Sequence, residues 1–517
     1  MPRCTGAGED DVPLPRSGWG CSVTIRLDGA SLSVSDVVAV AEHGEDAELS
    51  PVARERMRAH REVVTEVLAR GDRVYGLTTG VAERKRVTLL PSDQARFNRS
   101  LLRTHRMAQG TLASPAVVRA TMLILANGFA KGVSGVRPEL ADLVISALHT
   151  GIVPNVRTLG SVGQADLGPM ADLADALVVW GNFELAPNES LALVDTNAFS
   201  TACAALALGH VERLLDTLDV AAALDFEAYA ANVTAIHAVV GDTRPSPGVH
   251  TTLSNLQGLL AGSVLFESGS ARNLQDPLTF RCVPQVHGAA RDALGYVRAT
   301  VERELNTSQG NPVVVLSERA IVSVGNFDPV AMSAACDFAR IALAPAITSA
   351  AERTVKLLQN PSSGLTTGLA EDPETGDDGL AEFAVASQSL AVEARLLAQP
   401  VSFELASSSK AEGIEDRTTM APLSARRLGE IVELVTRVVA VELVVAAQAI
   451  DLRALGPLGR GTEIAYRAVR DRISYTGAGA PPPEDLEPLV EAVRDGDLSA
   501  TIEKPVTSSE TAWPPTS

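Results

Sequence analysis

Apolar residues recur along most of this chain at spacings of three and four, the period of a helix that buries one face. In residues 422–451 the repeat falls on Ile431, Leu434, Val438, Val441 and Val445. In residues 284–306 one face carries Val286, Ala289, Ala293, Val297 and Val301. Residues 191–230 and 328–358 are equally long and rich in apolar residues. The pattern predicts a mainly α-helical protein with a core bundle of four or five long helices.

Shorter segments complete this prediction. Residues Pro138–His149 read as a helix with proline in its first turn. Two pieces, Cys21–Leu27 and Val313–Leu316, are rich in residues that favour strands. The stretch Ser362–Gly379 is glycine-rich and acidic, which predicts a mobile loop.

The same pattern divides the chain into five segments. They are a disordered tail over residues 1–20, an N-terminal domain over 21–190, a central long-helix bundle over 191–460, a C-terminal helical segment over 461–503 and a disordered tail over 504–517. Apolar residues on the long helices spread beyond one stripe, so a second face is expected to pack against another subunit. The hypothesis is an oligomer.

Composition and charge exclude several classes of partner. Among 517 residues, 46% are hydrophobic but only 4% aromatic, so small aliphatic side chains must fill the core. The net charge of −19 repels phosphate backbones, which excludes nucleic acid as the expected partner. The cysteines are odd in number and form no CxxC pair: Cys4, Cys21, Cys203, Cys282 and Cys336. Neither a disulfide framework nor a metal site is predicted.

The chain is expected to be cytoplasmic. Residues Met1–Trp19 are polar and contain no apolar run, so they do not read as a signal peptide. The most apolar stretch, Ile431–Ile450, carries Arg437 and Glu442 inside it. Two charges in the middle of a span are costly in a bilayer, so no membrane span is predicted.

Six polar or glycine-rich segments interrupt the helices, and such segments are where binding and chemistry are usually found. They are Arg73–Gly80, Ser100–His105, Gly160–Pro169, Gln275–Gln285, Gly325–Phe327 and Glu415–Arg417. Residue type alone leaves their roles open. Tyr75 reads as an ordinary loop tyrosine or as a phenol presented between glycines, and His105 as a core histidine or a substrate contact. Arg281 pairs with either a structural acid or a ligand carboxylate. Asp195 reads as a pocket acid or as a capped or solvated one, and Glu415 as one of a solvated pair.

In order and spacing these segments resemble the histidine/phenylalanine ammonia-lyase and aminomutase family, over residues 30 to 460 or so. Further matches are Gly132–Pro138, Glu189–Leu193 and Glu304–Asn306. The resemblance implies a mainly α fold with a long central bundle of the fumarase/aspartase type and a smaller N-terminal region. It also implies a homotetramer in which several subunits build each active site.

The family's chemistry depends on a methylidene-imidazolone made by cyclisation of an Ala-Ser-Gly tripeptide. Its members read Gly-Ser-Val-Gly-Ala-Ser-Gly-Asp-Leu at this turn. Here Gly163 is followed only by Gln164 and Ala165 before Asp166, and no Ala-Ser-Gly occurs elsewhere in the chain. We therefore expect no cofactor, and interpret Gly163–Asp166 as a degenerate cofactor turn.

Other departures from the family's pattern concern the same missing group. Asp195 stands where the family has the asparagine that supports the ring, and Leu278 stands where it has a tyrosine. Arg417 replaces a histidine, and Thr78 replaces the asparagine after the glycine that follows the catalytic tyrosine. Several losses that serve one cofactor indicate a remodelled site.

The other half of the family's pocket is matched. By resemblance, Tyr75 is the catalytic base, Arg281 grips the substrate carboxylate, Asn326 and Phe327 form the wall beside it, and Glu415 is retained. Thr104 and His105 stand where histidine-specific members carry Ser-His, which favours a polar substrate.

Together these residues predict an enzyme that works without the prosthetic group. Tyr75 would act as acid or base, Arg281 would hold an anion, and Glu415 would complete the catalytic set. Thr104, His105, Asp195, Leu278, Asn326 and Phe327 would bind substrate.

The expected reaction is an elimination, isomerisation or cyclisation of a small carboxylate or amino-acid derivative. The Ala/Arg/Val-rich composition is typical of high-GC bacteria, where such relatives serve specialised metabolism. No ammonia-lyase activity on His, Phe or Tyr is expected, because general-base catalysis alone contributes about 10²–10⁴-fold. The alternative is a non-catalytic subunit that binds a small ligand or an active homologue.

Overall fold

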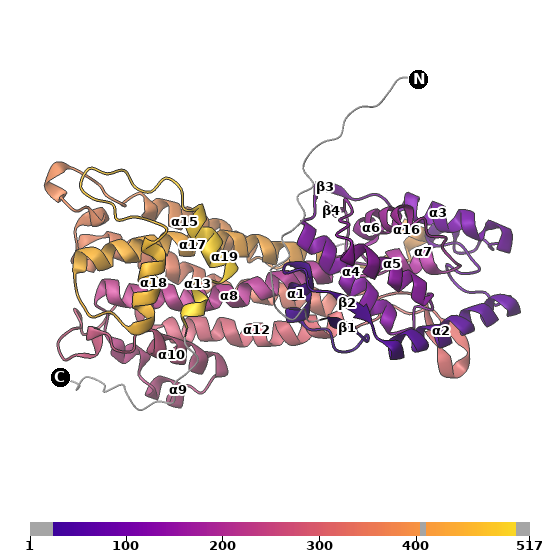
Figure 1. The fold of residues 1–517 in the computed structure, drawn as a ribbon, viewed down its shortest axis with the longest axis horizontal. Coiled ribbons are helices and arrows are strands. Elements are labelled where there is room, and N and C mark those ends of the chain that lie inside the picture. Colours follow the sequence, from indigo (N-terminus) through magenta and orange to yellow (C-terminus); the bar gives the residue numbers. More distant parts are fainter. Residues whose placement is uncertain (1–23, 404–409, 503–517) are drawn as a thin grey trace, which may run out of the picture. The chain divides into compact units, whose positions relative to one another are not determined.

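The computed structural model describes residues 24–403 and 410–502 (Figure 1). Helices make up 62% of the structure and strands 4%, so the predicted mainly helical fold class is confirmed. The predicted tails, together with Cys4 and Cys21, lie outside the described residues.

The described residues fold into two compact units. The first takes in residues up to 206 together with 302–330 and 404–422, and the second takes in 207–301, 331–403 and the chain from 423 onwards. The first unit thus extends past residue 190 and collects two later segments. The predicted boundaries at 190, 460 and 503 remain a prediction.

The first unit combines helices of moderate length with three two-stranded sheets. Its helices are α1 (Val34–Ala41), α2 (Pro51–Arg70), α3 (Gln94–Thr104), α4 (Pro115–Ala130), α5 (Pro138–His149), α6 (Leu167–Trp180), α7 (Glu189–Val194) and α16 (Lys410–Gly413). The strands pair as β1 (Ile25–Leu27) parallel to β2 (Ala47–Leu49), β3 (Gln109–Leu112) antiparallel to β4 (Arg157–Leu159), and β5 (Val313–Val315) antiparallel to β6 (Ala320–Val322). Helix α5 and strand β5 confirm two of the short predicted elements.

A Ser-Pro pair starts three helices in the two units. In α2 the Ser50 hydroxyl accepts the backbone N–H of Ala53, and in α4 Ser114 accepts that of Val117. Proline at the first helical position has no N–H to leave unpaired, and its fixed φ suits the helix. Ser246 starts α10 (Pro247–Leu259) in the same way.

Long helices dominate the second unit. They are α8 (Ala198–Tyr229), α12 (Val283–Leu305), α13 (Val330–Leu358) and α17 (Ala421–Arg453). Three of them, α12, α13 and α17, follow the predicted ranges closely, whereas the predicted stretch 191–230 is broken before Ala198. The shorter helices are α9 (Val239–Thr243), α10, α11 (Leu278–Arg281), α14 (Asn360–Ser363), α15 (Phe383–Leu397), α18 (Arg460–Arg470) and α19 (Glu487–Asp495). The predicted loop at Ser362–Gly379 contains two short 3-10 helices, Thr367–Leu369 and Pro373–Thr375.

The predicted apolar face of α12 is correct at its C-terminal end and wrong at Ala289. Val297 and Val301 are fully buried, whereas Ala289 is exposed and its neighbour Ala290 is buried. A helix turns about 100° per residue, so the buried stripe passes through His287 and Ala290 in this half of α12.

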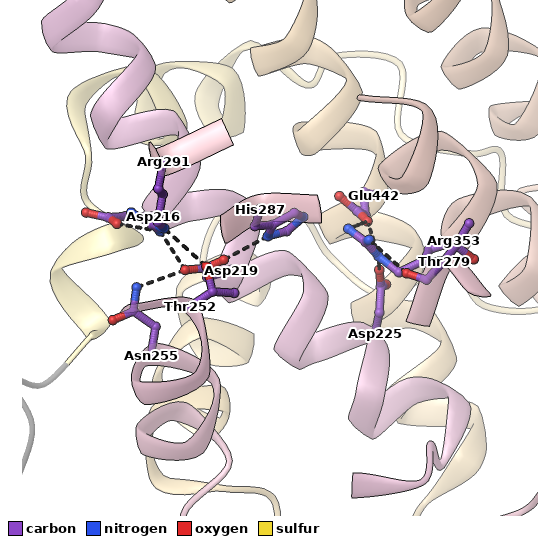
Figure 2. A network of polar contacts seen from close by, with 10 residues as sticks. All are labelled: Asp216, Asp219, Asp225, Thr252, Asn255, Thr279, His287, Arg291, Arg353 and Glu442. Carbon is purple, nitrogen blue, oxygen red and sulfur yellow. Dashed lines mark hydrogen bonds and ion pairs between the residues drawn. The ribbon is translucent and has the colours of Figure 1, made fainter. Parts of the chain in front are cut away.

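Charged side chains cross the core of the second unit (Figure 2). Arg353 of α13 donates from Nε to Asp225 of α8 at 2.7 Å and to Glu442 of α17 at 3.0 Å. Its Nη2 forms an ion pair with the Glu442 carboxylate at 2.7 Å, and all three side chains are fully buried. Six residues earlier on α8, Asp219 accepts from His287 Nδ1 at 2.8 Å and from Arg291 Nη2 at 2.6 Å. These contacts tie the four long helices together side by side.

Two stretches of the described chain are long and apolar enough to cross a membrane by length and composition. They are Glu189–Tyr229, whose most apolar window is 89% buried, and Val330–Leu358, whose window is 56% buried. Burial inside the protein accounts for the apolar character of the first stretch, as for a core helix of a bundle.

Candidate active site

The Tyr75 segment follows α2 directly. Gly71 ends α2 in the left-handed region, and the chain then folds over Val74, whose carbonyl accepts the N–H groups of Leu77, Thr78 and Thr79. Val74 and Leu77 are buried in an apolar cluster with residues of α2 and β5. Packing of these two neighbours fixes the loop and leaves the Tyr75 ring half-buried between them.

Gly76 explains why a glycine follows the tyrosine. Its φ is +69°, and a Cβ at this position would lie 2.2 Å from Cδ2 of Leu191. Both the backbone conformation and the close approach exclude a side chain here.

The Tyr75 hydroxyl lies in an acidic environment. Its oxygen accepts the backbone N–H of Ala82 at 3.0 Å. Burial raises the pKa of Tyr75, and the negative charges of Glu415, Asp195 and Glu83 raise it further, while the Ala82 N–H acts in the opposite direction. Tyr75 therefore carries its proton at neutral pH.

Asp195 occupies the break between α7 and α8 and is 9% exposed. Its Oδ2 accepts the backbone N–H of Asn311 at 3.0 Å. Burial raises the pKa of Asp195 to about 8, with a further contribution from the charge of Glu415. At neutral pH this residue is consequently an uncharged carboxylic acid, able to donate a proton.

A small pocket with a cavity volume of about 30 Å³ adjoins Asp195. Its walls come from α4, from the end of α7 and from the loop 307–312, all within the first unit. Asn188 and Ser134 also line it.

The turn at Gly163–Asp166 is held on both sides by backbone hydrogen bonds. The Gly163 carbonyl accepts from Thr419 Oγ1 at 2.7 Å and from Asn197 Nδ2 at 3.4 Å. The Ala165 N–H donates to the Phe327 carbonyl at 3.1 Å. Gln164 points its amide to the Asp328 carboxylate, with Nε2 and Oδ2 3.3 Å apart.

Two left-handed residues close this turn. Gly163 has a φ of +83°, and a Cβ there would lie 2.1 Å from Oγ1 of Thr419. Ala165 has a φ of +55°, a conformation that L residues seldom adopt and that costs about 1–2 kcal/mol. The two residues between Gly163 and Asp166 are thus sufficient to close the turn, at the cost of a strained alanine.

Asp166 is fully buried and links the turn to α8. Its Oδ2 accepts the N–H of Ser200 in the first turn of α8 at 2.7 Å, where a carboxylate is favoured by the free N–H groups. Burial raises the pKa of Asp166 to about 6, against these hydrogen bonds.

The segment carrying Glu415 is pinned to the segment after Tyr75. Lys85 Nζ lies 2.9 Å from the carboxylate of Glu412, and Arg86 pairs with the same carboxylate at 3.1 Å. The Ala411 N–H donates to Glu83 at 3.3 Å. These contacts bring Glu415 close enough to Tyr75 for its charge to act on the phenol.

Four other predicted site residues lie at the surface of the first unit. Thr104 is exposed at the end of α3 and His105 is half-buried, and both bond back to the carbonyl of Leu101. Asn326 is exposed and lines a second pocket, which also contains Arg56 and Lys131. Phe327 is half-buried and contributes its carbonyl to the turn.

Arg281 and Leu278 lie in the second unit, on the short helix α11. Arg281 Nε donates to the carbonyl of Asp276 at 2.7 Å. Among the described residues of its unit, no carboxylate forms an ion pair with Arg281, so the structural-acid alternative finds no support there. Leu278 is 62% exposed.

The sequence did not indicate three residues that hold the predicted site residues in place: Ala82 and Asn311, which donate from their backbone N–H groups, and Thr419, which contacts the turn. Ala82 donates to the phenol by its N–H, and Asn311 donates to Asp195 in the same way. Thr419 donates to the Gly163 carbonyl of the turn. It lies two residues after the segment Glu415–Arg417, and this closeness to a matched segment is the feature of the sequence that could have pointed to it. Within residues 24–403 and 410–502, no group of three or more His, Cys, Asp or Glu is placed to hold a metal ion.

Comparison with known proteins agrees with this architecture. The family model described as aromatic amino acid lyase matches residues 32–471. A histidine ammonia-lyase from Anaeromyxobacter sp. (strain K) is 35% identical, with 92% of this chain and 99% of the relative aligned.

Solved structures give the same result. The ergothionase of Treponema denticola has a TM-score of 0.85 at 26% identity, covering 92% of this chain and 99% of that one. The histidine ammonia-lyase of Trypanosoma cruzi has a TM-score of 0.84 at 27% identity, covering 93% and 95%. With its helical fold, its matched segments and these relatives, the chain belongs to the aromatic amino acid lyase family.

Proposed function

We propose that this protein is a lyase-family enzyme that works without a methylidene-imidazolone. The observation that carries the proposal is the turn at Gly163, where two residues stand in place of three and neither bears a hydroxyl. Without a serine there is no carbon to become the methylidene, and without the third residue there is no ring.

The hydrogen bonds of the turn support this view. The Ala165 N–H is committed to the Phe327 carbonyl, and the Asp166 N–H to the Thr196 carbonyl at 2.8 Å. Neither amide nitrogen is free to attack a neighbouring carbonyl. The residues present therefore do not fit the group, and the reaction must proceed with the side chains of the chain itself.

Tyr75 and Asp195 are the groups we assign to proton transfer. Both keep their protons at neutral pH, so each is an acid in the resting site. Tyr75 becomes a base only when positive charge lies near its oxygen, because a cation lowers the pKa that Glu415 and burial have raised. We therefore expect the substrate to bring positive charge to the phenol, as a protonated amine or imidazole does.

Arg281 is the anion clamp in this proposal. Its Nη atoms have no partner among the described residues, which suits bidentate binding of a carboxylate. Thr104 and His105 favour a polar side chain on the substrate. The relatives named histidine ammonia-lyase and ergothionase agree with a polar, amino-acid-derived substrate. We propose elimination, isomerisation or cyclisation of such a molecule.

Two measurements test the proposal. The first is the intact mass of the denatured protein: we expect the encoded value, and a mass two waters short, with the loss mapped to residues 161–167, refutes it. The second is turnover of a panel of polar amino acids and carboxylates, followed by mass spectrometry. Tyr75→Phe should lower the rate of a converted substrate by about 10²–10⁴-fold, while Tyr466→Phe, a matched change in the second unit, leaves it intact.

An inactive wild type would favour the alternative, a non-catalytic partner subunit. Retained activity in the Tyr75 variant would remove Tyr75 from the mechanism. Histidine, phenylalanine and tyrosine belong in the panel, because release of urocanate or a cinnamate at ordinary turnover contradicts the loss of the cofactor.

We also propose that the chain assembles as a homotetramer. Large apolar side chains are exposed on the second unit, among them Phe338 and Ile341 on α13 and Tyr296 on α12, at 44%, 45% and 53%. Exposed apolar surface of this kind is typical of subunit interfaces. Light scattering at micromolar concentration should give four chain masses, and a monomer would contradict the proposal.

A further inference from the structure

The pocket beside Asp195 contains buried oxygen atoms that have no partner. Asn188 is 5% exposed, and its Oδ1 accepts no hydrogen bond from the described residues. Its Nδ2 donates to the Ser134 carbonyl at 2.7 Å, which fixes the amide orientation and leaves Oδ1 as an acceptor. The Ser134 hydroxyl is buried and unpartnered as well. Each unpaired buried polar group costs about 1–3 kcal/mol, so a ligand that donates hydrogen bonds would be favoured here.

Two other polar side chains of the pocket are already hydrogen-bonded. Thr196 Oγ1 donates to Gln309 Oε1 at 3.0 Å, and Gln309 Nε2 donates to Thr201 and Glu304, both at 2.9 Å. The buried side-chain atoms of this pocket without a partner are Asn188 Oδ1 and the Ser134 hydroxyl, and the Asp195 carboxyl lines the same pocket. Each of these groups can accept a hydrogen bond.

Charge points in the same direction. None of the residues lining this pocket is Lys, Arg or His, and Asp195 is its one titratable side chain. By resemblance, Asp195 stands where the family carries an asparagine. Replacing an amide by a carboxyl exchanges an N–H donor for an ionisable acceptor, which favours a cation over a neutral or anionic ligand.

We propose that this pocket binds a primary ammonium group, either free ammonium or the head of an amine ligand. Ammonium offers several N–H donors and one positive charge, and the pocket offers two uncharged oxygens, those of Asn188 and Ser134, and one carboxyl. A water molecule supplies only two donors and no charge. The role assigned to the pocket, holding the amino group of the substrate or its released ammonium, rests on the proposed function, but the binding does not.

Binding should be linked to a proton. The pKa of Asp195 is about 8, raised by burial and by the facing charge of Glu415, and Tyr75 is the other titratable group that its charge reaches. A bound cation favours the ionised carboxylate, so ammonium binding releases a proton. Affinity should accordingly increase as the pH rises towards 8 and level off above it.

The experiment follows thermal unfolding of the full-length protein at pH 8.5 in ammonium, methylammonium, sodium and potassium chloride at equal ionic strength. Ammonium should raise Tm above the sodium reference, and the shift should grow with its concentration. Asp195→Asn should lose this difference. Ser134→Ala, which removes a hydroxyl without a partner, should weaken the apparent affinity by about tenfold or more. Glu55→Gln, an exposed acid of the same unit, is the control and should behave like the wild type.

Comparison of ammonium with methylammonium distinguishes free ammonium from the head of an amine ligand. A response to ammonium alone assigns the pocket to free ammonium, and an equal or stronger response to methylammonium assigns it to an amine head. Equal shifts in all four salts, a potassium response that matches ammonium, or a response that survives Asp195→Asn overturns the proposal. If Asp195→Asn fails to fold, line broadening of ¹⁵N-ammonium with wild type and Ser134→Ala gives the same decision. A negative result leaves the Tyr75 test untouched.

Discussion

The buried triad of Asp225, Arg353 and Glu442 makes a sharp prediction about pH (Figure 2). Two carboxylates share one guanidinium, and none of the three side chains reaches solvent. Burial, followed by the charge of Glu442, raises the pKa of Asp225 well above its ordinary value, although Arg353 opposes this. The folded protein therefore keeps a proton on this pair of carboxylates to a higher pH than the unfolded chain does, and in the protonated form the net charge of the triad is zero.

The sign of the effect follows from that proton. Asp225 has an ordinary pKa of 3.8, so the unfolded chain releases its proton near pH 4, while the folded chain keeps it to a higher pH. A raised folded pKa contributes stability that is fully present below pH 4 and is lost as the pH rises through the folded pKa. In this window the free energy of unfolding should fall by up to about 1.4 kcal/mol per pH unit because of this carboxyl.

The perturbation is Glu442→Gln. It removes the second negative charge, so Asp225 ionises and pairs alone with Arg353, and the triad remains neutral. The lost charge-assisted hydrogen bond should cost about 1–3 kcal/mol at low pH, and the descending slope should become flatter. Asp225→Asn, which resembles the protonated acid, should flatten it too. Arg353→Met leaves two buried acids without a cation and should cost about 3–5 kcal/mol.

The assay is urea unfolding followed by circular dichroism at several pH values between 5 and 8. Glu433→Gln serves as the control, because Glu433 lies on the same helix, pairs with Arg494 at 2.9 Å and is 50% exposed. The difference between wild type and each variant cancels the other titrating groups. The reasoning is refuted if the free energy of unfolding depends on pH in the same way in the wild type, Glu442→Gln and Asp225→Asn. Parallel curves would mean that the triad holds no proton.

Three further predictions concern the first unit. In ammonium-free buffer, the Tm of the wild type should fall between pH 5 and 8, because Asp195 has a folded pKa of about 8 and its stabilising contribution is lost as the pH rises towards that value. Asp195→Asn should make this fall in Tm smaller. An unchanged pH profile of Tm would contradict the prediction. Gly163→Ala should lower the free energy of unfolding in urea by at least about 2–3 kcal/mol, because the new Cβ would lie 2.1 Å from Oγ1 of Thr419. Gly160→Ala is the control and should lower it less, because no atom lies nearer than 3.5 Å to a Cβ at that position. Ser50→Ala should cost about 1 kcal/mol through the lost cap of α2, and an unaltered urea midpoint would argue against the cap.

The long helices could be predicted because their cause is written in the sequence. Apolar positions at spacings of three and four are sufficient to place α12, α13 and α17 within about two residues of their bounds. The break in the stretch 191–230 was not predicted. It lies at residues 195–197, where the Thr196 carbonyl accepts from Asp166 and the Asp195 carboxyl accepts from Asn311, contacts that join segments distant in sequence.

The candidate site was found by motif and not by geometry. Tyr75, Asp195 and Glu415 were all singled out from the sequence, and their charges do act on one another in the fold. Their protonation could not be predicted, because it depends on burial and on neighbours more than a hundred residues away. The role of Ala82 could not be predicted, because it donates from its backbone N–H, which every residue except proline has.

Hydrogen bonds on either side of the turn at Gly163–Asp166 limit which substitutions could convert it into the family's Ala-Ser-Gly turn. At one end of the turn, the Thr419 hydroxyl donates to the Gly163 carbonyl, and at the other end the Ala165 N–H donates to the Phe327 carbonyl. Two residues close the distance between these hydrogen bonds only because Ala165 adopts a left-handed conformation. A serine substituted for Gln164 or Ala165 would supply a hydroxyl but not the third residue, and an inserted residue would have to break one of these hydrogen bonds. If the turn forms no electrophile, as we propose, the chain can gain one only through an insertion together with repacking at Thr419 or Phe327, so any activity has to depend on side chains such as Tyr75, Asp195 and Glu415.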